Sequence, residues 1–403
     1  MRRSSTRLRA LAAVAALGLV VSGCGRGGEG DTAAAGVTDK EIKIGGIYAF
    51  TGPSPSYEAS YGALAYFDMV NAKGGVNGRK IRFITRDGKY QPGDTLQAAK
   101  QLVEQEDVFA LFHVLGTPTN LALQNYVNQQ KVPHVYVETG AATFGADLRK
   151  NPWTVGYQPP YTNEGEAYGR HVAREKPNGK VGILYQNDSL GADFTRGFEK
   201  GIQGSGVKIV ARQPYEVSDP SVNSHVSNLK ASGADVFLNA TTPKFAAQAI
   251  RQAAAIGWRP LQLLPSLDAS PELVLKPAGF EASRGIVSMA WFKSPTEFPD
   301  DPAVKEFVDA LARYQPKGNK NSAAVQRGWI AAQLFVRALQ TQKEPTREGL
   351  MKAVLNMDTT LPVLLDGVSI KTSPTDGYAV QSLRLQRFTG TEWRTFGEVM
   401  DFS

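Results

Sequence analysis

Residues 42–63 have the sequence IKIGGIYAFTGPSPSYEASYGA, and this stretch decides the fold. It starts with a β-branched and apolar run that predicts a strand over 42–50. Small polar residues and prolines come next. Tyr61, Leu64 and Phe67 then recur at helical spacing, which predicts a helix over 60–71. A strand, a loop and a helix in this order are the first half of a βαβ unit on a parallel sheet.

The same alternation continues on both sides of a pause near residues 151–153. Before the pause we predict strands over 80–87, 108–115 and 132–137 and helices over 94–105 and 117–130. After it we predict strands over 180–185, 208–215, 236–240 and 261–264 and helices over 164–175, 193–202, 221–231 and 243–256. The remainder adds helices over 302–313, 323–339 and 347–357 and strands over 380–388 and 393–399. We therefore predict an α/β protein with two doubly wound parallel-sheet lobes and a cleft between them.

The N-terminus predicts export and lipidation. Four arginines precede an apolar run over 11–21, which is too short to span a bilayer about 30 Å thick and is typical of a signal peptide. The run ends in Val21-Ser22-Gly23-Cys24, which looks like a bacterial lipobox. We expect a lipoprotein signal peptide over 1–23, acyl chains on Cys24, and a flexible tether over 24–40. The alternative is an ordinary secretory peptide with an unrelated cysteine, and the export route is open between the general and twin-arginine pathways.

Composition excludes several classes of function. Cys24 is the only cysteine among 403 residues, so the folded part has neither disulfides nor a cysteine metal site. Removing residues 1–23 leaves 380 residues, enough for two ordinary domains. It also lowers the net charge from +7 to +3, because the leader holds four arginines and no acids. The remaining charge does not argue for a nucleic-acid partner.

Loops at the predicted carboxyl ends of strands are the candidate binding residues, because ligands of parallel α/β sheets bind there. Gly116 and Thr117 follow the third strand, with Thr117 expected as a helix N-cap before Pro118. Such a helix end favours an anion. The loop over 139–142 is small enough for its backbone to approach a ligand. In the second half, Thr241 belongs to a similar threonine-proline cap.

The order and spacing of several segments resemble the branched-chain amino-acid class of periplasmic binding proteins, which have the type I fold. The segments are residues 42–63, NAKGGVNGRKIRFITRDGKYQPGDTLQAAKQLV at 71–103, VGILYQNDSLGADFTRGFEKG at 181–201 and AAAIGWRPLQLL at 253–264. The resemblance implies two lobes that close around a ligand and are joined by three chain crossings, near Gly156, Met289 and Gly367. Lobe 1 would comprise 41–156 plus 290–366, and lobe 2 would comprise 157–289 plus 367–403.

The resemblance also implies a function. The protein would capture a small molecule outside the cytoplasm, at the outer face of the cell membrane, and deliver it to the permease subunits of an ABC importer. We expect a monomer that performs no chemistry itself and needs no cofactor or metal.

The family's ligand contacts can be carried over to this sequence. Its carboxylate-binding loops fall on Gly116, Thr117, Thr139, Ala141 and Ala142, and its stacking aromatic residue falls on Tyr61. Tyr57 and Tyr161 lie in polar loops and are further contact candidates.

Three departures from the family pattern affect the expected ligand. Leu190 replaces a tyrosine before Gly191, the first-lobe disulfide is missing, and Leu267 aligns with the acid that pairs with an ammonium group, with Asp268 adjacent. A buried ammonium without a carboxylate partner is costly. We therefore expect a carboxylate on an apolar or aromatic body, and an apolar amino acid if Asp268 reaches the cleft.

An enzyme and a ligand sensor are the two alternatives to a transport protein. An enzyme is disfavoured because the four histidines are scattered and no nucleophile elbow or phosphate-binding loop follows a strand. His113 lies in a strand that looks buried, and Asp300-Asp301 precede a helix as expected caps. A ligand sensor of the same fold is the alternative to a transport protein, since fold does not fix function.

The lipobox leads to a first prediction. Cys24→Ala should release the protein into soluble fractions or block its processing, because acyl chains contribute about 0.8 kcal/mol of membrane affinity per buried methylene. Ligand affinity should not change. Cell fractionation with mass determination of the N-terminus tests this, and a correctly cleaved variant that stays on the membrane would contradict it.

Overall fold

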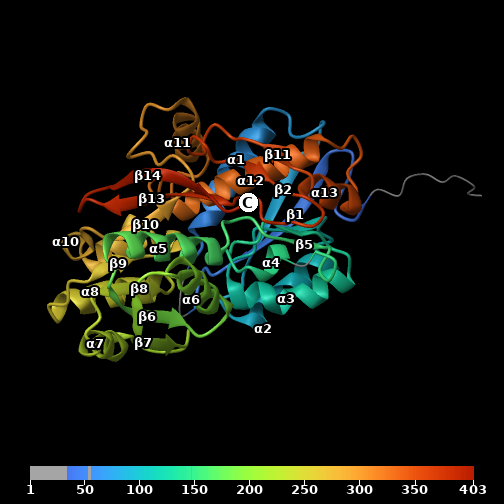
Figure 1. Ribbon diagram of the computed structural model, residues 1–403. Coiled ribbons are helices and arrows are strands. Elements are labelled where there is room, and N and C mark those ends of the chain that lie inside the picture. The colour runs from blue at the N-terminus through green and yellow to red at the C-terminus, as the bar shows by residue number, and fades with distance from the viewer. Residues whose placement is uncertain (1–33, 53–55, 147) are drawn as a thin grey trace, which may run out of the picture. The chain divides into compact units, whose positions relative to one another are not determined.

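The computed structural model (Figure 1) describes residues 34–52, 56–146 and 148–403. Its first sheet is parallel throughout. The five strands have the order β2-β1-β3-β4-β5. β1 pairs with β2 from Glu41 to Tyr48, so the two strands run side by side over their whole length. The strands are β1 (Glu41–Tyr48), β2 (Lys80–Asp87), β3 (Ala110–Phe112), β4 (His134–Val135) and β5 (Thr154–Val155).

The second sheet repeats this topology and extends it. Its order is β14-β13-β10-β9-β8-β6-β7, and the five strands from β10 to β7 are parallel in the same arrangement as the first sheet. β13 and β14 are antiparallel additions at one edge. The strands are β6 (Lys180–Gln186), β7 (Lys208–Tyr215), β8 (Val236–Ala240), β9 (Leu261–Leu263), β10 (Val287–Ala290), β13 (Ser382–Phe388) and β14 (Trp393–Asp401).

Helices connect and cover these strands. The first half contains α1 (Glu58–Ala72), α2 (Pro92–Lys100), α3 (Thr117–Gln129) and α4 (Thr143–Ala146). The second contains α5 (Tyr161–Glu175), α6 (Ser189–Gly201), α7 (Asn223–Ala231), α8 (Pro243–Ala255), α9 (Lys276–Ala278) and α10 (Phe280–Ser283). The chain then returns to pack α11 (Pro302–Tyr314) and α12 (Ala323–Gln340) against α1, as Figure 1 shows, and continues through α13 (Arg347–Val354), β11 (Asp358–Thr359) and β12 (Ile370–Lys371). The first lobe is therefore built from two distant parts of the sequence.

The predicted alternation of strands and helices is confirmed, while several bounds differ. The third and fourth strands are shorter than expected, at three and two residues. The helix predicted over 94–105 ends at Lys100 and continues as a wider π-helical turn over Gln101–Gln105. Asp301 caps α11 as expected, since its Oδ1 accepts hydrogen bonds from the backbone N–H groups of Ala303 and Val304. Short elements such as β5 and α4 have no periodicity that a sequence pattern could reveal.

The lobe boundaries predicted from the sequence stay a prediction. The chain leaves the first sheet after β5 and returns to the first lobe after β10. On its last pass, β12 still pairs with β11, and the Tyr378 hydroxyl donates a hydrogen bond to the carbonyl of Ala142. The chain joins the second sheet only at Ser382, where β13 begins.

The signal peptide over 1–23 and Cys24 lie outside the described residues, as does the tether up to residue 33. Within the described part of the chain, no helix combines the length and the apolar character that crossing a membrane requires.

Glycines set the distance between α1 and α12. A Cβ added at Gly328 would collide with the carbonyl oxygen of Ala59 in α1, and one added at Gly62 would collide with that of Val325 in α12. The two helices thus approach so closely that only glycine fits at either contact. This contact fixes the start of α12 over the first sheet.

We predict that Gly328→Ala lowers the free energy of unfolding by about 1–3 kcal/mol, because the added methyl group forces the helices apart. Gly93→Ala is the matched control, since Gly93 lies in α2 with nothing within 4 Å of an added Cβ. That variant should be neutral or more stable by up to about 1 kcal/mol. Urea unfolding measures both, and equal effects at the two positions would contradict the close contact.

Candidate functional site

A cavity of about 60 Å³ lies where loops from both lobes meet, and we call it the first cavity. It lies beyond the carboxyl ends of β1 and β3 in one sheet and of β6 and β8 in the other. These are the points at which strand order reverses in each sheet, the usual position of ligands in such folds. Its lining is Ser56, Tyr57, Glu58, Ala59, Tyr90, Leu115, Gly116, Thr117, Glu138, Gln158, Tyr161, Leu190, Thr242, Pro243, Leu267, Ser270, Leu273, Ala324 and Arg327.

A buried ion pair lies at the wall of the first cavity. Arg327 Nε, in α12, lies 2.7 Å from Glu138 Oε1, just beyond β4. His113 Nε2 lies 2.7 Å from the other oxygen of Glu138. Burial raises the pKa of Glu138, but the charges and hydrogen bonds of Arg327 and His113 outweigh it and hold the pKa at about 2. Glu138 is therefore ionised at neutral pH, and its negative charge is matched within the protein.

Arg327 has hydrogen-bond donors left over. Only its Nε is bonded to Glu138, and no hydrogen bond of its two Nη atoms to another described residue is present. The guanidinium group borders the first cavity and is itself only 5% exposed. A buried guanidinium with free donors suits a carboxylate, which can accept two parallel hydrogen bonds from it.

The N-terminus of α3 faces the same cavity. Gly116 is the N-cap residue, with φ 98°, and Thr117 is the first helical residue, so the expectation that Thr117 caps the helix is corrected by one position. The positive φ suits glycine, and a Cβ there would come within 2.6 Å of the Tyr90 ring. The Thr117 hydroxyl turns instead to Thr139, 2.7 Å away. Helix N–H groups and dipole here add to the attraction for an anion.

Glu58 is a carboxylate in the first cavity without an ion-pair partner among the described residues. It lies at the start of α1, and one of its oxygens accepts a hydrogen bond from the Ser322 hydroxyl. Burial raises the pKa of Glu58 above its usual value. The cavity thus offers a positive group, Arg327, and a separate half-buried acid.

The structure brings five of the predicted contact residues to the first cavity, namely Tyr57, Gly116, Thr117, Tyr161 and Leu190. Six others do not line it: Tyr61, Thr139, Ala141, Ala142, Thr241 and Asp268. The polar groups of the loop over 139–142 are engaged elsewhere, since Ala142 N donates to Asp193 Oδ2 at 2.7 Å. Thr241 donates its hydroxyl to Asn239 Oδ1 at 2.9 Å, while its neighbour Thr242 lines the cavity. The roles assigned to these eleven residues remain predictions.

Asp268 lies behind the cavity wall. Leu267, in the turn Ser266–Asp268, lines the cavity, whereas Asp268 is fully buried and does not line it. Neither of its oxygens has a hydrogen-bond partner among the described residues. Burial and the nearby charge of Glu164 raise the pKa of Asp268 well above its usual value.

Residues 41–392 match the family model of periplasmic binding proteins.

The chain belongs to the periplasmic binding protein family.

Its relatives are distant but cover most of its length. Leu/Ile/Val-binding protein homolog 7 of Brucella abortus (strain 2308) is 24% identical over 328 residues, covering 77% of this chain and 80% of that protein. A branched-chain amino acid ABC transporter protein from Thermus thermophilus with bound valine has a TM-score of 0.81 at 19% identity, covering 91% of this chain and 98% of that one. A fatty acid ABC transporter substrate-binding protein from Thermomonospora curvata has a TM-score of 0.79 at 23% identity, covering 92% and 95%.

These matches confirm the family and the type I fold that the sequence predicted. As a member of this family, the protein binds a ligand outside the cytoplasm.

Sequence reasoning missed three charged residues of the site. Glu58 and Glu138 follow strands without any distinguishing pattern. The sequence could have indicated Arg327, because it is the one charged residue in the first half of the largely apolar helix Ala323–Gln340. A charge on the buried face of such a helix is rare unless it is paired. Its partner Glu138 is 189 residues away and could not be inferred from spacing.

The buried acid Glu164, in α5, leads to a prediction about pH. Its carboxylate accepts hydrogen bonds from Tyr168 and from the backbone of Ser266, yet burial dominates and raises its pKa from 4.5 to about 7. A carboxyl whose pKa is higher in the folded state stabilises the fold below pH 4.5, and this contribution is lost as pH rises through 7. Glu164→Gln should remove that loss, which amounts to about 3 kcal/mol at most.

Urea unfolding at several pH values tests this. Wild type should lose stability relative to Glu164→Gln between pH 4.5 and 7. Glu175→Gln, on the exposed side of the same helix, is the control and should follow wild type. A difference between wild type and Glu164→Gln that does not change with pH would show that Glu164 keeps an ordinary pKa.

Proposed function

We propose that this protein captures a small apolar or aromatic carboxylate, or an amino acid of that kind, in the first cavity and delivers it to an ABC importer. The free Nη donors of Arg327, buried beside the N-terminus of α3, carry this proposal. An anion at this position gains charge-assisted hydrogen bonds in a medium of low dielectric constant. The remaining wall is largely apolar and includes Leu190, Leu267 and Leu273.

The names of the similar proteins support this ligand class. They refer to leucine, isoleucine and valine, to bound valine, and to fatty acids. All of these molecules carry a carboxylate on an apolar body. They differ in whether an ammonium group is present, so the shared fold leaves that question to the residues of each site.

We propose that the ligand does not need Asp268. Leu267 occupies the position at the cavity wall from which an acid could contact the ligand. Asp268 does not line the cavity, and its pKa is raised. Where the ligand has an α-ammonium group, Glu58 is the acid in position to accept it, because Glu138 is already paired with Arg327 and His113. Glu58 and Arg327 line one small cavity, as the two charges of an amino acid require.

The wider role follows from the N-terminal sequence and the family. We propose that acyl chains on Cys24 anchor the protein at the outer face of the membrane and that a flexible tether lets the binding lobes reach the permease. The protein would bind its ligand as a monomer without transforming it.

Calorimetry with leucine and with isocaproate, its deaminated counterpart, tests the proposal. Arg327→Lys keeps a positive charge beside Glu138 but cannot offer the paired donors, so both ligands should bind about tenfold or more weakly, a loss of about 1.5–3 kcal/mol. Glu58→Gln should weaken leucine binding only, and Asp268→Asn should change neither.

Thermal unfolding shows whether each variant is folded. Leucine binding that collapses in Asp268→Asn and survives in Glu58→Gln would overturn the assignment of the ammonium partner. Unchanged affinity for both ligands in Arg327→Lys would overturn the carboxylate site itself.

A further inference from the structure

A second cavity, of about 160 Å³, lies next to the first and is the larger of the two. Its apolar part includes Trp291, Phe292, Trp393 and Phe280, three of which are almost fully buried. Its polar part includes both buried residues, such as Gln326 and Gln386, and exposed ones, such as Thr296. The full lining is Ser266, Ala269, Pro271, Glu272, Phe280, Met289, Ala290, Trp291, Phe292, Ser294, Pro295, Thr296, Asn321, Ala323, Gln326, Arg327, Gln386, Thr391, Glu392 and Trp393.

Arg327 borders both cavities, and the two share one partition. Neighbouring residues of α12 face opposite sides, since Ala324 lines the first cavity and Ala323 the second. The facing segment does the same, with Ser270 on the first side and Ala269 on the second. No hydrogen bond joins residues 269–271 to 323–327 in the described structure. Residues 323–324 and 269–270, which carry only small side chains, therefore lie between the two cavities without a hydrogen bond that joins the two segments.

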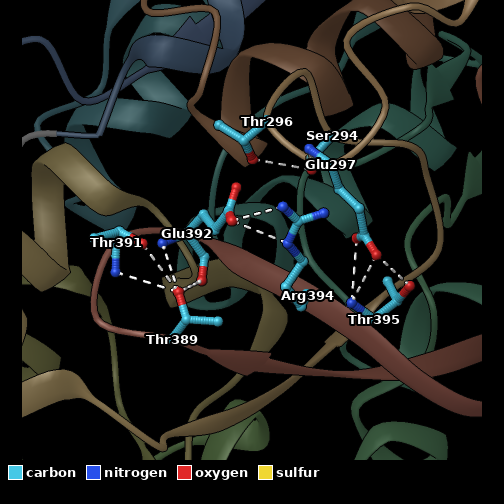
Figure 2. A network of polar contacts seen from close by, with 8 residues as sticks. All are labelled: Ser294, Thr296, Glu297, Thr389, Thr391, Glu392, Arg394 and Thr395. Atoms are coloured by element: carbon cyan, nitrogen blue, oxygen red, sulfur yellow. Dashed lines mark hydrogen bonds and ion pairs between the residues drawn. The ribbon is translucent and has the colours of Figure 1, made fainter.

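The outer wall of the second cavity is held much more firmly. Figure 2 shows that β14 is tied to the segment over 294–297 through Thr395, while the residues of the turn before β14 bond to one another and to Arg394. Glu297 accepts hydrogen bonds from the backbone N–H and the hydroxyl of Thr395, at 3.0 and 2.8 Å. Arg394 donates to Glu392 at 2.7 Å. Trp393 is fixed from inside, because its Nε1 donates to the carbonyl of Ala269 at 2.8 Å. The aromatic wall is thus preformed.

We propose that the two cavities form one binding site, in which a monocarboxylate is held at Arg327 and its aryl or long apolar body extends past Ala323 into the second cavity. The inference rests on the proposed function and names its substrate class, an elongated carboxylate larger than a branched-chain amino acid. Contacts between aromatic rings favour an aryl group beside Trp291 and Trp393. Aromatic pairs contribute binding free energy in addition to what the buried apolar area provides.

The test compares pentanoate with ω-phenylpentanoate, which differ only by the ring, in calorimetric titrations of the full folded chain. Each acid is also used as its α-amino derivative, so that the result does not depend on Glu58. In wild type the ring should tighten binding by about tenfold or more, because it buries a large apolar surface. Ala323→Phe fills the second cavity and should abolish this gain while leaving pentanoate within about twofold.

Ala324→Phe is the matched control, because it fills the first cavity from the adjacent position and should weaken every ligand. Thr296→Phe, at the exposed rim of the second cavity, obstructs the same space without touching the partition, and it serves if Ala323→Phe does not fold. A ring that gives no gain in wild type, or a gain that survives both Ala323→Phe and Thr296→Phe, overturns the inference alone. If wild type binds none of the four compounds, the proposed function fails together with it.

Discussion

The buried ion pair between Glu138 and Arg327 is the interaction on which the site depends. Taking both charges out of water costs several kcal/mol per ion, and their attraction repays this only with good geometry and additional hydrogen bonds. Arg327 Nε donates a hydrogen bond of 2.7 Å to one oxygen of Glu138, and His113 Nε2 lies 2.7 Å from the other oxygen. Because Glu138 follows β4 and Arg327 belongs to α12, the pair joins the first sheet to a helix from the far end of the sequence. The glycine contact between α1 and α12 holds that helix at the distance the pair requires.

The duplicated topology explains why a site forms between these elements at all. Each sheet reverses its strand order once, and at each reversal two loops diverge and leave a crevice. The first cavity uses the loops after β1 and β3 in one sheet and after β6 and β8 in the other. The hydrogen bonds from Ala142 N to Asp193 Oδ2, at 2.7 Å, and from the Thr139 hydroxyl to the Tyr161 hydroxyl, at 3.4 Å, join the loop over 139–142 to helices α6 and α5 of the second lobe. The small loop over 139–142 thus serves contact between the lobes in this structure.

The acids near the cavity differ in charge because their surroundings differ. Glu138 is ionised, since Arg327 and His113 compensate for its burial. Glu164 and Asp268 are equally buried but lack a positive partner of that kind, so burial raises the pKa of both. Because Leu267 rather than an acid lines the first cavity, the part of the wall formed by the turn Ser266–Asp268 carries no charge. The positive charge of Arg327 and the half-buried Glu58 then decide which charged ligand groups fit.

The alternation of strands and helices, the two repeated halves and the loops at the strand ends could be predicted without coordinates, because these features follow from periodicity and turn residues that are local in the chain. The family resemblance also followed from local segments in a recognisable order. Only the tertiary structure decided which side chains meet in the cavity. Arg327 and Glu138 are far apart in the sequence and come together through the return of α12, which no local pattern encodes. The choice between Leu267 and Asp268 depended on the rotation of a single short turn, where a shift of one residue exchanges an apolar wall for an acid.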